Sequence, residues 1–229
     1  MRILAADDFV FARYPVPLAA DEIQLWFVPS RASAGAHAEE PWLRPLLAAY
    51  VGCRADELTL IRGEHGKPSL AEPPALEFNL SHTRGGALVG ISREQALGVD
   101  IETRHRSRPV VELARRYFAD TEAAALSRVA APHRQVAFLR LWSCKEAVVK
   151  ALGRGIGFGL ARVAFALDAD GEPIHLNVID ASAGSIAEWQ IVGLAPTREL
   201  VGALAWRGPI RPVRAFAMRP LDLLVHASG

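Results

Sequence analysis

The chain has 229 residues, of which 51% are hydrophobic and 22% are charged, and its formal net charge at pH 7 is +1. This composition predicts a soluble globular protein with a sizeable core, and the near-neutral charge argues against a general nucleic-acid binder. Apolar stretches end before the roughly 18 to 20 residues of a membrane span, and acidic residues follow Met1 too soon for a secretory signal, so we expect a cytoplasmic protein with no membrane segment.

The N-terminal part of the chain contains short strand patterns, one helix pattern and loops. Residues 23–28 predict a strand that Pro29 closes. The next predictions, in chain order, are an Ala- and Gly-rich loop, a helix that Gly52 stops, a short strand and a turn-rich loop, at 30–40, 41–50, 58–61 and 63–68.

Two strand-like runs, 78–82 and 86–92, flank a short turn and predict a hairpin. A strand around Asp100 follows. Helical spacing of apolar residues over 110–118 predicts a helix, Asp120 is a candidate cap for a second one, and a long helix is expected from Pro132 to Gly153. The rest is strand-rich, with strands predicted at 163–167, 174–179, 189–194 and 200–206.

The run Gly98-Val99-Asp100-Ile101-Glu102 alternates apolar and acidic residues. This is the period of a strand with one buried face, so Val99 and Ile101 should point into the core and Asp100 and Glu102 should share the opposite, exposed face. Two neighbouring carboxylates raise each other's pKa unless a cation lies between them. The pattern therefore indicates a cation site, while the structural alternative is a solvated strand face.

In the run 142–150, Glu146 and Lys150 lie four residues apart on one stripe of the predicted long helix. Apolar residues that include Trp142 can cover the core-facing side, so Glu146 and Lys150 should face away from that core. The alternative is an ordinary helix-supporting ion pair. The two cysteines lie far apart without metal-type spacing, so neither a zinc site nor a disulfide framework is implied.

A weak internal repeat relates the N-terminal and C-terminal parts of the chain. The runs 86–92 and 199–205 share a pattern, and a helix that ends in Gly52 or Gly153 precedes the strands of each part. This suggests an α+β fold with two similar halves that join near residue 105. Two unrelated α+β domains are the alternative.

Four motifs in order resemble those of the 4′-phosphopantetheinyl transferases of the Sfp type: Gly66-Lys67-Pro68, 78–83, 98–102 and 142–150. The resemblance implies two α/β halves related by a pseudo-twofold axis, 1–105 for the adenosine and phosphates of coenzyme A and 106–229 for the catalytic helix and carrier docking. It also implies a monomer that moves phosphopantetheine from coenzyme A to a serine of an acyl or peptidyl carrier protein, releasing adenosine 3′,5′-bisphosphate.

By this resemblance, Asp100, Glu102 and Glu146 are ligands of Mg²⁺, a hard cation that prefers oxygen. Glu146 would also act as base for the carrier serine, and Lys150 would bind phosphate or protonate the leaving oxygen. The resemblance assigns coenzyme contacts to further residues, Gly66, Lys67, Pro68, Ser81 and His82. From chemistry alone, the first three form a surface turn, His82 is a structural hydrogen-bonder, and Asn79 and Ser81 shape the hairpin.

The segment that should bind the coenzyme 3′-phosphate departs from the family pattern. It is short, and its basic candidates are Arg31, His37 and Arg44. We assign the contact to Arg31 or Arg44. The alternative to a transferase is a carrier-binding module of the same fold without turnover.

A basic run follows the acidic strand, and complementary charge speeds encounter with an acidic partner. We interpret it as a docking surface for the carrier protein, with solvated charge as the alternative. Its members are Arg104, His105, Arg106, Arg108, Arg115 and Arg116.

Overall fold

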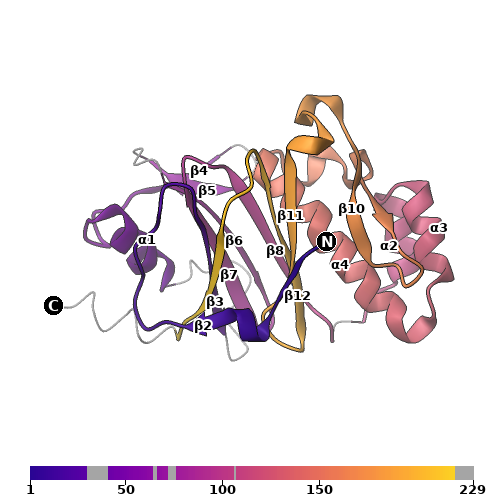
Figure 1. Cartoon of the computed structure of the whole chain (residues 1–229), viewed down its shortest axis with the longest axis horizontal. Coiled ribbons are helices and arrows are strands. Elements are labelled where there is room, and N and C mark those ends of the chain that lie inside the picture. Colours follow the sequence, from indigo (N-terminus) through magenta and orange to yellow (C-terminus); the bar gives the residue numbers. More distant parts are fainter. Residues whose placement is uncertain (30–40, 64–65, 72–75, 106, 220–229) are drawn as a thin grey trace.

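The structure is a computed structural model that describes residues 1–29, 41–63, 66–71, 76–105 and 107–219. Figure 1 shows strands in the middle of the molecule, α1 at one end, and α2, α3 and α4 toward the other. The mixed α and β content agrees with the predicted α+β class. No helix within these ranges is long and apolar enough to cross a membrane.

The first sheet has five strands and is mixed, with two parallel and two antiparallel pairs. In spatial order they are β2 (Phe9–Phe11), β13 (Val213–Ala217), β3 (Ile23–Pro29), β7 (Gly86–Arg93) and β6 (Leu76–Thr83). The predicted hairpin is confirmed as β6 and β7, which pair from Thr83 opposite Gly86. The predicted strand at 23–28 is confirmed as β3.

The second sheet has four strands. In spatial order they are β1 (Ile3–Ala5), β11 (Trp189–Ala195), β12 (Leu200–Arg207) and β8 (Leu97–Thr103). Two-stranded pairs complete the β structure: β4 (Leu60–Arg62) with β5 (Pro68–Leu70), and β9 (Val163–Leu167) with β10 (Pro173–Ile179). The predicted C-terminal strands are confirmed as β9, β10, β11 and β12.

The helices are α1 (Leu43–Val51), α2 (Val110–Tyr117), α3 (Asp120–Arg128) and α4 (Ala131–Leu152), and short 3₁₀ turns lie between other elements. The stops of α1 and α4 were predicted correctly. Gly52 and Gly153 have φ angles of 80° and 69°, the left-handed conformation that glycine adopts without strain. Pro132 lies in the first turn of α4, where its missing N–H costs no helical hydrogen bond.

The core is layered. One apolar cluster fills the space between the two sheets and includes Leu25, Val99 and Leu204. Another packs α1 on the outer face of the first sheet. A third packs α4, α2, α3 and the β9–β10 pair on the outer face of the second sheet. The second sheet is therefore covered on both faces wherever α4 crosses it.

Several local predictions need correction. Asp120 is the first residue of α3 and not its cap, because Ala119 takes the cap position and its N–H donates to Glu122 at 3.1 Å. Pro68, predicted in a loop, begins β5, and the strand predicted at 58–61 lies at Leu60–Arg62. The loop predicted at 30–40 lies outside the described residues.

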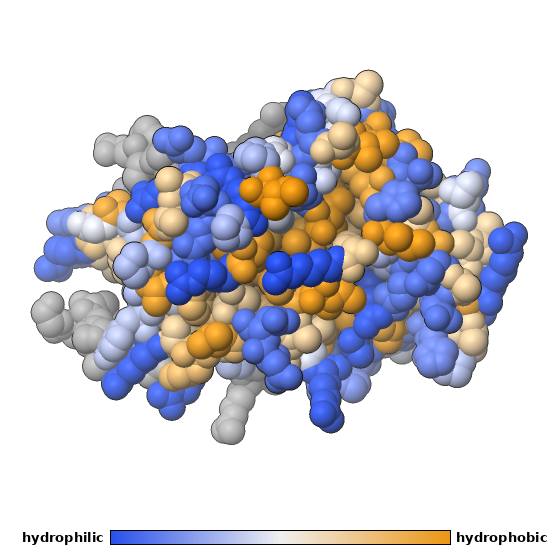
Figure 2. Space-filling model, viewed as in Figure 1, coloured by the Kyte–Doolittle hydropathy of each residue, from blue (hydrophilic) through white to orange (hydrophobic). Residues whose placement is uncertain are grey.

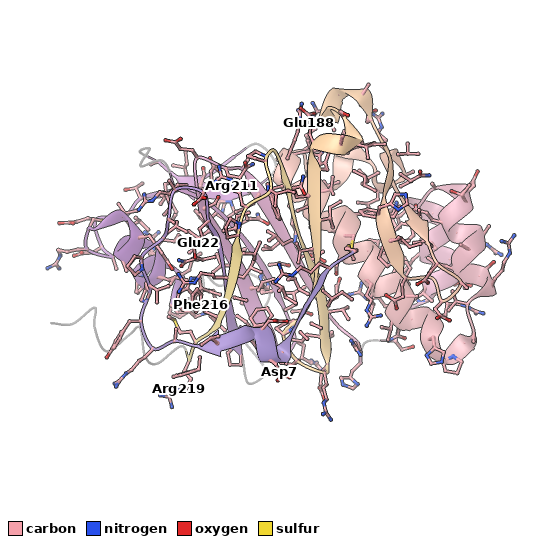
Figure 3. All side chains as sticks on the ribbon, viewed as in Figure 1. Asp7, Glu22, Glu188, Arg211, Phe216 and Arg219 are labelled. Carbon is pink, nitrogen blue, oxygen red and sulfur yellow. The ribbon has the colours of Figure 1, made fainter. Side chains whose placement is uncertain are left out.

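Two strands that the sequence patterns missed each join the sheet formed mainly by the other part of the chain. The N-terminal β1 pairs in parallel with β11, and the C-terminal β13 lies between β2 and β3. On β13, Phe216, which is labelled in Figure 3, stacks on Trp26 with ring centroids 4.7 Å apart. The five-stranded and the four-stranded sheet thus both contain strands from either side of residue 105. The division of the chain into two halves at this residue and their pseudo-twofold relation stay predictions.

Candidate active site

The two most specific motifs meet where α4 lies across β8. Gly98 permits this contact, because a methyl group at that position would lie 2.1 Å from the carbonyl oxygen of Ala147 and 2.4 Å from the amide nitrogen of Ala151. The backbones of strand and helix therefore approach more closely than any larger residue would permit. Two residues further along β8, Asp100 follows on the same face of the strand.

The acidic face of β8 is buried, which corrects the expectation of an exposed face. Asp100 is 6% exposed and Glu146 is 7% exposed, because α4 covers this side of the strand. Val99 and Ile101 pack in the core between the sheets, as predicted. Both faces of the strand are thus covered, and Glu146 does not face outward into solvent.

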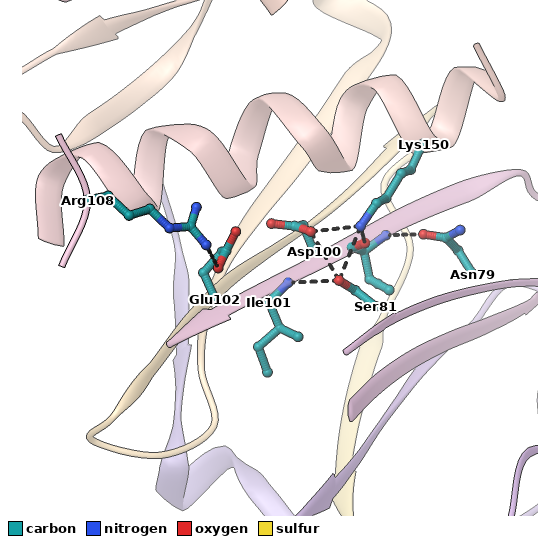
Figure 4. Close-up of polar contacts among 8 residues, drawn as sticks. Asn79, Ser81, Asp100, Ile101, Glu102, Arg108 and Lys150 are labelled. Atoms are coloured by element: carbon teal, nitrogen blue, oxygen red, sulfur yellow. Dashed lines mark hydrogen bonds and ion pairs between the residues drawn. The ribbon is translucent and has the colours of Figure 1, made fainter. Parts of the chain in front are cut away.

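Lys150 reaches from α4 to β8 and forms an ion pair with Asp100 (Figure 4). Its ammonium nitrogen lies 2.7 Å from Asp100 Oδ1, 3.1 Å from Ser81 Oγ and 3.1 Å from the Val99 carbonyl oxygen. The structure therefore brings together residues that are 50 or more positions apart in sequence. This contact crosses the interface between α4 and β8, whereas the helix pattern had suggested a pair within α4.

Asn79 and Ser81 join the two sheets through their side chains. Asn79 Oδ1 accepts a hydrogen bond from the Val99 amide at 2.8 Å, and Ser81 Oγ accepts one from the Ile101 amide at 3.3 Å. The Ser81 hydroxyl also donates to Asp100 Oδ1 at 3.0 Å. Both residues lie in β6 of the predicted hairpin, but their side chains bridge to β8 (Figure 4). No local sequence signal indicated that these two side chains of β6 would bond to β8.

Glu102 forms an ion pair with Arg108, whose Nη2 lies 2.8 Å from Glu102 Oε2. Both side chains are mostly buried. Burial and the neighbouring Asp100 raise the pKa of Glu102, and Arg108 partly opposes this. Arg108, which the sequence placed in a docking surface, therefore supports the acidic strand, while Arg106 lies outside the described residues.

Glu146 lies in a strongly perturbed environment. Burial raises its pKa to about 7, with further contributions from Asp100 and Glu102 and an opposing one from Lys150. Glu146 Oε1 and Asp100 Oδ2 are buried and have no hydrogen-bond partner among the described residues. Buried carboxylate oxygens are normally satisfied, so two such atoms of one sign suit a bound cation.

These donors fit Mg²⁺ in kind, since the ion takes carboxylate oxygens and keeps several waters. Among the described residues, however, no group of three His, Cys, Asp or Glu side chains converges closely enough to hold a metal ion. The carboxylate of Glu102 contacts Arg108, as described above. Asp100 and Glu146 supply the oxygens without a partner.

The other predicted site residues lie in different surroundings. Lys67 donates to the carbonyl oxygens of Leu97 at 3.2 Å and Lys150 at 3.1 Å, and burial lowers its pKa. Gly66 and Pro68 flank it. His82 is exposed on β6. Arg44 of α1 donates to the Leu58 carbonyl at 2.6 Å, and Arg31 lies outside the described residues.

Lys145, beside Glu146, is a residue whose role the sequence patterns missed. Its ammonium is completely buried and pairs with Glu122 at 2.5 Å, and it donates to the carbonyls of Leu160 and Val163. This pair connects α4 to α3 and to the segment that leads into β9. Trp142 packs beside Tyr117 and Phe118, as its prediction as a core residue requires.

A cavity of about 350 Å³ lies on another side of α4, and none of the predicted site residues lines it. Its walls include Met1, Ile3, Cys144 and Ile174. Figure 2 shows apolar surface on the face that carries the N-terminus, and Met1, Ile3 and Ile174 are partly exposed. This cavity is separate from the contact between Asp100 and Lys150.

Comparison with known sequences identifies relatives of this chain. The sequence pattern of the 4′-phosphopantetheinyl transferase superfamily matches residues 96–203, which include β8 and α4. The 4′-phosphopantetheinyl transferase HetI of Nostoc sp. is 32% identical over 169 residues, which are 72% of this chain and 68% of HetI. The chain therefore belongs to the 4′-phosphopantetheinyl transferase superfamily.

Two further relatives match over shorter stretches. The protein slr0495 of Synechocystis sp. is 36% identical over 123 residues, which are 53% of this chain and 50% of slr0495. The 4′-phosphopantetheinyl transferase Sfp of Bacillus subtilis is 33% identical over 110 residues, which are 48% of this chain and 47% of Sfp. The chain thus spans about half the length of these two relatives.

Proposed function

We propose that this chain transfers the 4′-phosphopantetheine arm of coenzyme A to a serine of an acyl or peptidyl carrier protein in a Mg²⁺-dependent reaction. The proposal rests on one observation above all. In a member of the transferase superfamily, Asp100, Glu146 and Lys150 come together between β8 and α4, and two carboxylate oxygens there have no hydrogen-bond partner within the part of the chain that the structure describes.

Asp100 and Glu146 are the proposed metal ligands, with Glu102 as the third. Bound Mg²⁺ supplies positive charge that offsets the negative charge of the coenzyme's pyrophosphate and of the leaving group. In a site closed by α4, charge interactions are stronger than in water. The buried carboxylates are therefore well placed to bind a cation tightly.

Lys150 is the proposed phosphate clamp. Its ammonium is only partly buried, and a phosphate oxygen would replace part of its contact with Asp100. Phosphoryl transfer depends mostly on positioning and charge stabilisation, which an ammonium fixed by Ser81 and the Val99 carbonyl can provide.

Glu146 is the proposed base that accepts the proton of the carrier serine, directly or through water. Its pKa of about 7 suits proton transfer near neutral pH. A carboxylate that binds a metal is a weaker base, so its two roles compete.

For the coenzyme, we propose that the N-terminal half binds the adenosine and phosphates through Gly66, Pro68 and His82. The exposure of His82 leaves its imidazole open to a phosphate. Arg31 and Arg44 stay the candidates for the 3′-phosphate. For Arg44, this role would compete with its bond to the Leu58 carbonyl.

The test is mass spectrometry of an apo carrier protein incubated with coenzyme A, Mg²⁺ and this chain. Transferase activity predicts that the carrier gains the mass of one phosphopantetheine. Binding of the carrier without a mass gain would instead identify a binding module of the same fold. If the carrier showed neither binding nor a gain in mass, both functions would be contradicted.

A further inference from the structure

Lys67 lies where three elements meet: the turn between β4 and β5, the start of β8, and the last turn of α4. Its ammonium donates to the Leu97 carbonyl of β8 and to the Lys150 carbonyl of α4. These two acceptors are main-chain atoms of separate elements. One side chain from the β4–β5 turn therefore holds strand and helix together.

The Lys150 carbonyl lies at the C-terminal end of α4, where helical carbonyls lack their usual partners. It also accepts a hydrogen bond from the Gly153 amide at 3.1 Å. A cation at this end satisfies the carbonyl and interacts favourably with the helix dipole. The Leu97 carbonyl lies next to Gly98, where the backbone of α4 touches β8.

Partial burial of an ammonium is costly unless it has hydrogen-bond partners. Burial lowers the pKa of Lys67, and the ion pairs of the described residues do not include it. Two of the three N–H groups of Lys67 donate to main-chain carbonyls, and one of these carbonyls belongs to Lys150. Lys67 therefore holds the part of the α4 main chain from which the Lys150 side chain extends.

We propose that Lys67 is a positioning residue that fixes the end of α4 on β8, so that Lys150 reaches Asp100. This inference rests on the proposed transferase function and departs from the coenzyme contact that the family resemblance assigns to the Lys67 side chain. Lys67 acts through the main chain of Lys150, while Gly66 and Pro68 of the same turn keep their proposed place beside the coenzyme.

The test compares K67M, which keeps an apolar stem, with K67R, whose guanidinium can donate to both carbonyls. R54M is the control, because Arg54 is an exposed basic residue of the same part of the chain that pairs with Asp56 and touches none of the proposed site residues. For K67M we expect kcat to fall about ten- to a hundredfold, as for a misplaced reacting group. The Kd for coenzyme A should change less than about threefold, and K67R should recover most of kcat.

Amide hydrogen exchange provides a readout that does not need turnover. In K67M, exchange of the Gly153 and Arg154 amides, which close the end of α4, should accelerate, while R54M should match the original chain. This measurement decides the positioning role even if no carrier is modified. If K67M does not fold, K67Q replaces it, because its amide can still donate to one carbonyl.

Two results would overturn the inference. One is a loss of coenzyme A affinity in K67M that exceeds the loss of kcat, which would show direct contact with the coenzyme. The other is unchanged exchange at Gly153 and Arg154, which would show that Lys67 does not hold this end of the helix.

Discussion

Glu146 carries a carboxylate that folding removes from water and places near Asp100. Its pKa is raised to about 7 from the ordinary value of 4.5. Between these values the folded chain keeps a proton that the unfolded chain releases. The free energy of unfolding must therefore fall as the pH rises through this interval. At the proposed cation site, ionised Glu146 therefore lowers the free energy of unfolding as long as no cation is bound.

The E146Q variant should lose this dependence, because glutamine does not titrate. In metal-free buffer, the free energy of unfolding of the original chain should fall by up to about 3 kcal/mol more than that of E146Q between pH 4.5 and 8. The raised pKa of Glu102 acts in the same direction in both proteins and cancels. Urea unfolding at a series of pH values measures the difference.

Glu112 provides the control, since it is exposed on α2. E112Q should keep the pH dependence of the original chain. Equal slopes for E146Q and the original chain would contradict the buried, proton-binding state of Glu146.

At the scale of elements, the site depends on how closely α4 lies on β8. Gly98 sets this distance. Gly202 on the neighbouring β12 sets the approach of β12 to β8, since a methyl group there would lie 2.4 Å from the Asp100 carbonyl oxygen. The nearest atoms at both positions are backbone atoms, which cannot rotate away. A side chain at Gly98 would therefore push α4 away from β8, and one at Gly202 would push β12 away from β8.

We therefore expect G98A to destabilise the protein by about 3 kcal/mol or more, because overpacking at this contact forces the backbone to move. Gly157 is the matched control, since a methyl group there meets nothing within 4 Å. G157A should change the free energy of unfolding by no more than about 0.5 kcal/mol. A G98A variant as stable as G157A would show that β8 and α4 are not in direct backbone contact.

The helix α2 carries the part of the basic run that remains free for a partner. Arg115 and Arg116 are exposed, and Arg116 lies 5.2 Å from the ring centroid of Tyr117. By contrast, Arg108 pairs with Glu102 inside the candidate site, His105 pairs with Glu199, and Arg104 is half-buried. The docking surface proposed for the carrier is therefore reduced to Arg115 and Arg116 on α2.

Replacing Arg115 and Arg116 with Glu should raise the apparent KM for an acidic carrier about tenfold at low salt, with less effect at high salt. The KM for coenzyme A should stay unchanged. R128E, an exposed change on the neighbouring α3, is the control. Steady-state kinetics with both substrates measures this, and an unchanged KM for the carrier would refute docking on α2.

At the scale of the whole molecule, the two sheets share a core and exchange strands. The C-terminal β13 lies between β2 and β3, and Asn79 and Ser81 connect β6 to β8. The halves of the proposed pseudo-twofold arrangement are therefore not expected to fold separately. Loss of one strand should affect the fold as a whole.

A chain truncated after Gly208 tests this. It loses β13, so β2 and β3 lose their common neighbour and Trp26 loses its stacking partner Phe216. We expect no cooperative unfolding transition in this fragment, as followed by circular dichroism. A cooperative transition like that of the full chain would show that the first sheet forms without β13.

The long elements and the motifs could be predicted from local pattern, because amphipathic spacing, Pro132 and the glycine stops act within a few residues. Asp100, Glu146 and Lys150 could be proposed as site residues because four motifs in order resemble those of the family. Their spacing alone left a solvated strand face and an ordinary helix ion pair as alternatives. The burial of these residues could not be predicted, since alternation in β8 indicates one polar face but not that α4 covers it. The hydrogen-bond partners of Ser81 and Lys67 could not be predicted either, because they come from distant segments of the chain.

Short strands could not be predicted for the same reason, namely that they depend on distant segments. The strands β1 and β2 have three residues each, and β1 pairs in parallel with β11 almost the whole chain away. Such short segments carry no period of their own, so tertiary contacts alone make them strands.

The transfer assay with D100A tests the central claim most directly. An apo carrier, coenzyme A and Mg²⁺ are incubated with the original chain, with D100A and with the surface control E112Q, and the carrier is weighed by mass spectrometry. We predict a gain of one phosphopantetheine with the original chain and E112Q, lost when Mg²⁺ is chelated, and no gain with folded D100A. Full transfer by D100A would contradict a catalytic site between β8 and α4.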